Sequence, residues 1–164
     1  METTFPAPPI PTGRGRADFA ALGEIWRAMV EGESDPIARM ATAAALIYQS
    51  DDRVNWAGFY RADSATGGLV LGPYQGAPGC LRIAAGRGVC GAAAASGQTQ
   101  IVPDVHAFPG HIACDARSRS ELVIPVFDSG GHVSAVLDLD SHLPDAFSED
   151  DARALESWFA VGEL

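Results

Sequence analysis

Apolar residues at three- and four-residue steps predict two helices near the start of the chain. The first spans residues 17–30, and the second begins after Asp35. Pro36 suits the first helical position, where its missing N–H needs no partner. The expected core-facing side chains are Phe19, Leu22, Ile25, Trp26 and Met29 in the first helix, and Ile37, Met40, Ala44 and Ile47 in the second.

Alternating patterns predict strands in the middle of the chain. Residues 54–61 place Trp56, Gly58 and Tyr60 on one face, with Ala57 and Phe59 on the other. A turn at 63–68 returns the chain into a second strand. The remaining expected strands cover residues 69–74, 80–83, 99–102, 121–127 and 133–140.

Two further helices complete the predicted elements. An alanine-rich helix follows the glycines of residues 86–91 and ends at Gly97, and a last helix starts at a capping box of Ser148 and Asp151. Residues 103–119 follow neither period, and long irregular segments in compact domains are often functional. The order of elements predicts an α+β fold, with an antiparallel sheet and helices packed on its faces.

Composition narrows the class of protein. The 164 residues suit one domain, expected at 17–164 after a disordered leader rich in proline, glycine and arginine at 1–16. A net charge of −10 argues against nucleic acid, and no apolar run reaches the roughly 18 residues of a membrane span. Three cysteines without a secretion signal indicate a reducing, cytoplasmic location.

The three cysteines lie in unusual surroundings. Cys80 follows Gly79, Cys90 lies between glycines of residues 86–91, and Cys114 lies between His111 and Asp115. A buried cysteine normally acts as a small apolar residue. Thiols beside charged groups in irregular segments are instead those whose reactivity is tuned. The first hypothesis is therefore a thiol-based redox enzyme.

Two other interpretations of these phrases are weaker. Residues 86–91 match a dinucleotide-binding fingerprint, but no βαβ unit is predicted around them. A zinc site would usually use closely paired ligands, whereas the cysteines are 10 and 24 residues apart. Only His111 and Cys114 have ligand-like spacing. We therefore expect neither a metal nor a cofactor.

Acidic and aromatic residues supply a candidate pocket. Asp138 and Asp140 alternate at the end of an apolar strand and so face the same side, and Glu121 opens the neighbouring strand. These carboxylates form either a solvated sheet face or an acidic pocket that attracts an ammonium group. Trp56 and Tyr60 are either core residues or the aromatic wall of that pocket.

The irregular segment adds two histidines. His106 and His111 either pack the loop or position Cys114. Carboxylates near a thiol raise its pKa, which is unfavourable for a nucleophile. Arg117 and Arg119 are the candidates for offsetting that field.

Taken together, these phrases resemble the free methionine-(R)-sulfoxide reductases, a family built on a single GAF domain. The resemblance therefore implies that the α+β fold is GAF-like. Agreement extends over residues 17–158, and generic GAF domains lack all three cysteines in these contexts. The hairpin at 128–132 is one residue longer than usual, and the chain ends soon after Trp158. The matching stretches are residues 55–60, 71–76, 80–83, 86–91, 104–106, 110–116, 120–121 and 137–141.

The resemblance implies thiol-dependent reduction of free methionine-(R)-sulfoxide. Cys114 would be the nucleophile that becomes a sulfenic acid, Cys80 the resolving thiol, and Cys90 a further participant. Thioredoxin would reduce the resulting disulfide. Substrate contacts would come from Trp56, Tyr60, Glu121, Asp138 and Asp140, and Asp138 is the expected proton donor.

Two functions of other classes stay open at this point. One is a non-catalytic GAF module that senses a small ligand, and the other is a structural metal-binding protein. GAF domains often pair through their terminal helices, so residues 17–30 and 148–162 are the expected contact of a homodimer.

Overall fold

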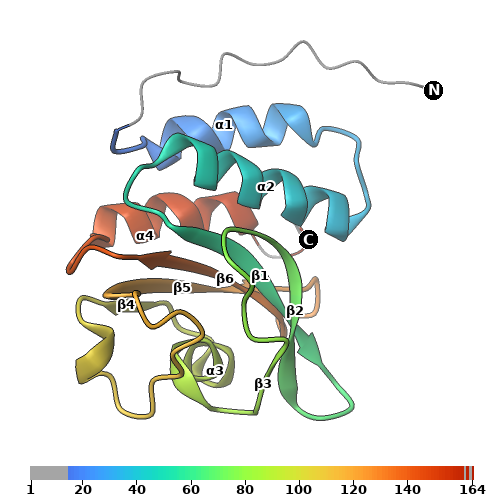
Figure 1. The fold of residues 1–164 in the computed structure, drawn as a ribbon. Coiled ribbons are helices and arrows are strands. Elements are labelled where there is room, and N and C mark those ends of the chain that lie inside the picture. Colours follow the sequence, from blue (N-terminus) through green and yellow to red (C-terminus); the bar gives the residue numbers. More distant parts are fainter. Residues whose placement is uncertain (1–14, 161, 163) are drawn as a thin grey trace.

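The protein is a sheet covered by helices on both faces (Figure 1). The computed structural model describes residues 15–160, 162 and 164, so the expected leader at 1–16 lies outside the described residues except for its last two. Helices α1 (Phe19–Met29), α2 (Pro36–Ser50) and α4 (Glu149–Glu156) cover one face of the sheet. Helix α3 (Gly88–Ser96) and the long irregular segment cover the other.

The sheet has six antiparallel strands in the order β3-β2-β1-β6-β5-β4. Their bounds are β1 Trp56–Asp63, β2 Gly68–Gln75, β3 Arg82–Ile83, β4 Gln100–Val102, β5 Ser120–Phe127 and β6 Val133–Ser141. The predicted α+β fold is confirmed. Helix α3 connects strands at opposite edges of the sheet, so the βαβ context that a dinucleotide fingerprint needs is not present around it.

Side-chain caps fix the helix starts, and α1 begins at Phe19, two residues after the predicted start at residue 17. Asp18 accepts hydrogen bonds from the backbone N–H groups of Ala20 and Ala21. Ser148 and Asp151 form the expected reciprocal capping box at α4. Asp151 also accepts a hydrogen bond from Arg16 at 2.9 Å, so the start of the described chain is tied to α4.

Two apolar clusters lie on opposite faces of the sheet. The first packs α1, α2 and α4 on the sheet, and Trp26 stacks on Trp158 there with ring centroids 5.7 Å apart. Phe59 belongs to this cluster, whereas Trp56 and Tyr60 belong to the second, on the α3 side. The predicted alternation along β1 is therefore confirmed, and it assigns the two aromatics to the α3 side.

Some local predictions need correction. Strand β3 is only Arg82–Ile83, so Cys80 lies in a loop and not in the strand expected at 80–83. Residues 103–119 are irregular except for a 3₁₀ turn at Val105–Ala107. Helix α4 ends at Glu156, and a 3₁₀ turn continues over Ser157–Phe159. Within the described chain, no helix is long and apolar enough to cross a membrane.

Candidate thiol and carboxylate site

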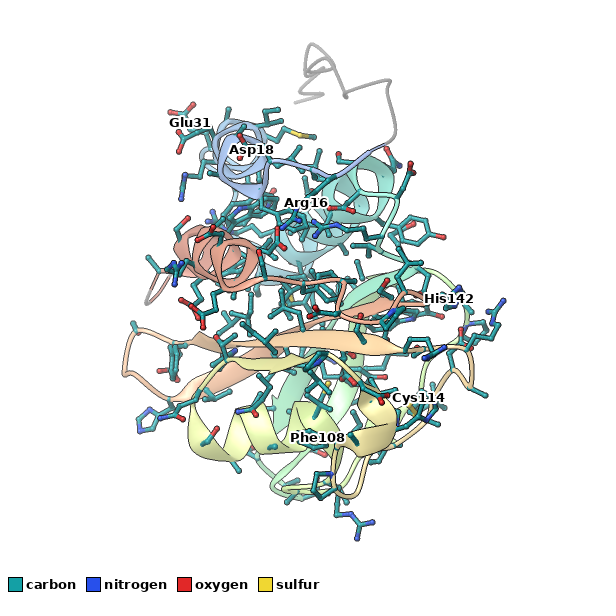
Figure 2. All side chains as sticks on the ribbon, turned by 90° about the vertical axis from the view of Figure 1, so that its left-hand side faces the viewer. Arg16, Asp18, Glu31, Phe108, Cys114 and His142 are labelled. Atoms are coloured by element: carbon teal, nitrogen blue, oxygen red, sulfur yellow. A yellow bond between two sulfur atoms is a disulfide. The ribbon has the colours of Figure 1, made fainter. Side chains whose placement is uncertain are left out.

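Two loops meet at a disulfide on the α3 side of the sheet. Cys80, between β2 and β3, is bonded to Cys114, which lies in the irregular segment before β5. Their Cα atoms are 5.5 Å apart although 34 positions separate them in sequence. Figure 2 shows Cys114 across the sheet from Asp18, which caps α1. Residue Cys114 is exposed, and Cys80 is half-buried.

A cavity lies directly beside this disulfide. Its wall includes Cys114 and the residue before Cys80, which is Gly79. Side chains of β1, β5 and β6 form further parts of the wall, and the start of α3 contributes Cys90. All five residues predicted to contact substrate line this one cavity: Trp56, Tyr60, Glu121, Asp138 and Asp140.

The register of the sheet brings the three carboxylates together. Glu121 near the start of β5 pairs directly with Asp140 near the end of β6. Asp138 lies two residues earlier on β6, so it has the same orientation as Asp140. On its other side β6 pairs with β1, where Asp140 is opposite Trp56. The carboxylates and the aromatic therefore share one face of three adjacent strands.

Burial and mutual repulsion favour the protonated forms of these carboxyl groups. The pKa of Glu121 is raised well above its usual range by burial and by Asp140. Burial, followed by Glu121, raises the pKa of Asp138, and burial, followed by Asp138, raises that of Asp140. A nearby cation favours the charged form of a carboxyl group. These three groups can therefore release protons when an ammonium ion binds beside them.

Asp138 is a buried carboxyl group at the wall of the cavity. It is 6% exposed, and its buried Oδ1 atom has no hydrogen-bond partner among the described residues. Buried polar atoms are nearly always paired, so an unpaired one in a cavity indicates a place for a ligand. The structure therefore rules out the solvated-face interpretation for Asp138.

Cys90 lies close to Glu121 and Asp138 and is almost fully buried. Its Sγ atom is 4.0 Å from Oε1 of Glu121. Burial, then Asp138 and Glu121, raise the pKa of the Cys90 thiol well above its usual range, so the thiol is protonated and weakly nucleophilic. One potential ligand atom each of Cys90, Glu121 and Asp138 lies within 4.8 Å of the others, the set that a metal would use here.

Trp56 is held rigidly at the cavity wall. It stacks on Tyr60 and on Tyr74, with ring centroids 5.9 Å and 5.3 Å away, and its indole N–H donates to the Ala77 carbonyl at 2.9 Å. A Cβ atom at Gly79 would lie 3.1 Å from the Tyr60 hydroxyl and 3.2 Å from the Trp56 ring. The chain leading to Cys80 therefore packs closely against both aromatics.

The two histidines of the irregular segment have different positions. His111 lines the cavity with its Nε2 atom 3.6 Å from Oε2 of Glu121, and burial lowers its pKa. His111 therefore faces the carboxylate of Glu121, whereas one interpretation of the sequence was that it positions Cys114. His106 is exposed and lies outside the cavity lining.

The arginines are also arranged differently from the expectation. Arg117 binds both carboxylate oxygens of Asp115 at 3.0 Å and lowers the pKa of Asp115 to about 2. It offsets that one charge without lining the cavity. Arg119 is exposed and does not line it either. Arg87 does line the cavity, and sequence reasoning missed it because its phrase was interpreted as a glycine turn.

The comparisons with known proteins agree with this geometry. The GAF domain family matches residues 27–158. A curated relative, Protein YtsP of Bacillus subtilis, is 50% identical over 88% of this chain and 88% of its own. The free methionine-R-sulfoxide reductase of Escherichia coli is 44% identical over 87% of this chain and 84% of its own.

A solved structure is also similar to this chain over most of its length. It is the free methionine-R-sulfoxide reductase of Neisseria meningitidis in complex with its substrate, which is 42% identical, with a TM-score of 0.81 and 89% of each chain covered.

Proposed function

Because this chain belongs to the free methionine-(R)-sulfoxide reductases, which are single GAF domains, we propose that it reduces free methionine-(R)-sulfoxide through Cys114 and Cys80. The observation that carries the proposal is the disulfide between these two residues at the wall of an acidic, aromatic cavity. A sensor module has no need of a bond there. A thiol reductase forms one in every cycle.

The chemistry takes three balanced steps. The Cys114 thiolate attacks the sulfoxide sulfur while an acid protonates the oxygen, which gives methionine and a Cys114 sulfenic acid. The Cys80 thiol then displaces water from that sulfenic acid and forms the disulfide. A dithiol such as thioredoxin reduces it by exchange and becomes oxidised itself. Such a reductant is kept active in reducing compartments, so a cytoplasmic location is part of the proposal.

Asp138 is the acid of the first step in this proposal. Support comes from its raised pKa and from its unpaired Oδ1 atom in the cavity. A carboxyl group that stays protonated near neutral pH can donate to the sulfoxide oxygen. Trp56 would pack against the apolar end of the substrate, since its ring is fixed at the same wall.

Glu121 and Asp140 are proposed to bind the substrate ammonium. Their direct pairing across two strands places two carboxyl groups at one point of the cavity, and an ammonium ion there would favour their charged forms. A substrate whose nitrogen lies in a peptide bond brings no cation to pair with these groups, so it would bind poorly. This is the reason that we expect activity on the free amino acid.

A coupled assay tests the proposal as a whole. The complete protein, thioredoxin, thioredoxin reductase and NADPH are mixed with free methionine-(R)-sulfoxide or with its N-acetyl derivative. We expect NADPH oxidation with the free amino acid and little with the blocked one. A protein that binds the sulfoxide but forms no methionine would be a sensor, and the proposal would be wrong. A homodimer through the terminal helices stays a separate prediction.

The Cys80→Ser variant should separate the two thiols. Attack by Cys114 needs no Cys80, so one methionine per enzyme should form in a single turnover. Repeated turnover with thioredoxin should collapse, because the sulfenic acid has lost its partner. Quantifying methionine with and without thioredoxin measures both. An undiminished steady-state rate would show that Cys90 resolves the intermediate.

The Asp140→Asn variant should weaken substrate binding and leave the saturated rate nearly unchanged. A charge-assisted hydrogen bond contributes about 1.5–3 kcal/mol, so KM should rise about 10- to 150-fold. Asp128→Asn is the matched control, because that half-buried aspartate lies in the β5–β6 hairpin and does not line the cavity. Equal KM values for the two variants would remove Asp140 from the ammonium site.

A further inference from the structure

In the proposed cycle, a dithiol protein has to reach the bond between Cys80 and Cys114. Its thiolate bonds to one of the two sulfur atoms, the Cys80–Cys114 bond breaks, and the other sulfur leaves as a thiolate and takes up a proton. The partner's second thiol then displaces the first sulfur, so the partner keeps a disulfide and this chain regains two thiols. A disulfide bond is only about 2 Å long. The partner's surface must therefore contact whatever surrounds the Cys80–Cys114 bond.

Apolar side chains flank this bond at the surface of the protein. Leu81, directly after Cys80, is 74% exposed, the highest value for a large apolar residue in the described part of the chain. Ala113, directly before Cys114, is exposed, as is Cys114 itself. Single exposed leucines are common on protein surfaces. Leu81 is informative because of its position, since it adjoins a sulfur atom that a partner has to reach.

The fold holds Leu81 in place without using its side chain. The backbone N–H of Leu71 in β2 donates to the Leu81 carbonyl at 3.0 Å. The Leu81 side chain belongs to neither apolar cluster and does not line the cavity. A partner would thus meet a leucine on an ordered backbone, and ordering costs little where the chain is already fixed.

The charged groups beside the bond are paired. Arg82, next to Leu81, binds Asp63 at 2.7 Å, and Asp115, next to Cys114, binds Arg117 at 3.0 Å. Covering an unpaired charge is expensive, so these ion pairs lower the cost of bringing an apolar surface close to the disulfide. An apolar centre with a polar rim is the usual plan of a protein–protein interface.

We propose that Leu81, with Ala113, forms the docking surface on which a dithiol reductase of the thioredoxin class covers the Cys80–Cys114 bond. The inference rests on the proposed function and extends it, because it states where the protein reductant binds. A small dithiol reaches the bond without covering the neighbouring side chains. The two kinds of reductant should therefore respond differently to a change at Leu81.

The test changes Leu81 and compares the two reductants. Wild type, Leu81→Ser, Leu81→Met and Ile37→Ser reduce saturating free methionine-(R)-sulfoxide with dithiothreitol, or with increasing thioredoxin kept reduced by thioredoxin reductase and NADPH. Ile37→Ser is the matched control, because Ile37 is 44% exposed on α2, which covers the opposite face of the sheet (Figure 1). Leu81→Met keeps an apolar side chain of similar volume.

We expect Leu81→Ser to lower kcat/KM for thioredoxin about 5- to 30-fold, the value of covering one largely exposed leucine side chain. Its rate with dithiothreitol and its KM for the sulfoxide should equal those of wild type, because Leu81 does not line the cavity. Leu81→Met should keep most of the activity with thioredoxin. Ile37→Ser should match wild type with both reductants.

Other results would overturn the inference. An unchanged kcat/KM for thioredoxin in Leu81→Ser would remove Leu81 from the docking surface. An equal loss with dithiothreitol would mean that Leu81 supports the loop of Cys80, and an equal loss in Ile37→Ser would mean that position on the surface is irrelevant. A wild type that works with dithiothreitol but not with thioredoxin would keep the proposed activity and eliminate this partner. If wild type forms no methionine with either reductant, the proposed function fails and the inference fails with it.

Discussion

Cys114→Ser should form no methionine at all, even when enzyme and free methionine-(R)-sulfoxide are mixed in equal amounts for one turnover. The physical reason is that a hydroxyl at this position stays protonated and cannot replace a thiolate as nucleophile. The two remaining thiols do not compensate. Cys80 would need to reach the sulfoxide sulfur from its own loop, and the Cys90 thiol is buried and kept protonated by neighbouring carboxyl groups.

The measurement is the methionine yield per enzyme, without any reductant. A stoichiometric burst from Cys114→Ser would place the nucleophile elsewhere. The comparison with Cys80→Ser is informative, because that variant removes the other half of the same disulfide and should keep the burst. A thermal unfolding curve of both reduced variants checks that the difference is chemical and not a loss of fold.

Asp138→Asn should lower the rate of the chemical step about 10²- to 10⁴-fold, the usual contribution of a general acid. An amide keeps the shape of the carboxyl group but has no proton to give. The measurement is single-turnover kinetics over a range of substrate concentrations, which separates the saturated rate from binding. A change in KM alone would make Asp138 a binding residue.

The pH profile gives a second check on Asp138. Burial raises its pKa, so the protonated donor persists to higher pH than in an exposed aspartic acid. The wild-type rate should therefore fall as the pH rises through that raised pKa, because the acid loses its proton. This descending limb should be missing in Asp138→Asn. An identical descending limb in both proteins would assign the proton to another donor.

The sequence predicted the fold well where periodicity is strong. The alternation of Trp56, Gly58 and Tyr60 was assigned correctly because strand side chains alternate strictly between two faces. Strand β3 was predicted two residues too long, since its pairing depends on the edge of β2 and not on its own pattern. A short edge strand carries too few residues for a period to be visible.

Within the site, the residues on strands could be placed from the pattern of the sequence, whereas the contacts of those on loops could not. Glu121 and Asp140 could be matched because antiparallel strands bring the start of one beside the end of the next. The contact of His111 with Glu121 depends on the path of a loop that has no period. Arg87 was overlooked for a related reason. The glycines beside it suggested a turn, and only the structure places that turn at the cavity.

The bond between Cys80 and Cys114 has one more consequence, which concerns the stability of the enzyme during its own cycle. It closes a loop of chain that contains β3, α3, β4 and part of the wall of the cavity. In the chain-entropy treatment, a cross-link over 34 positions disfavours the unfolded state by about 4 kcal/mol. The reduced enzyme, which must admit substrate, is thus the form that unfolds more easily. Each turnover passes through the more stable, disulfide-bonded form. Cells short of reductant would accumulate the disulfide-bonded enzyme, which is more stable but inactive until it is reduced.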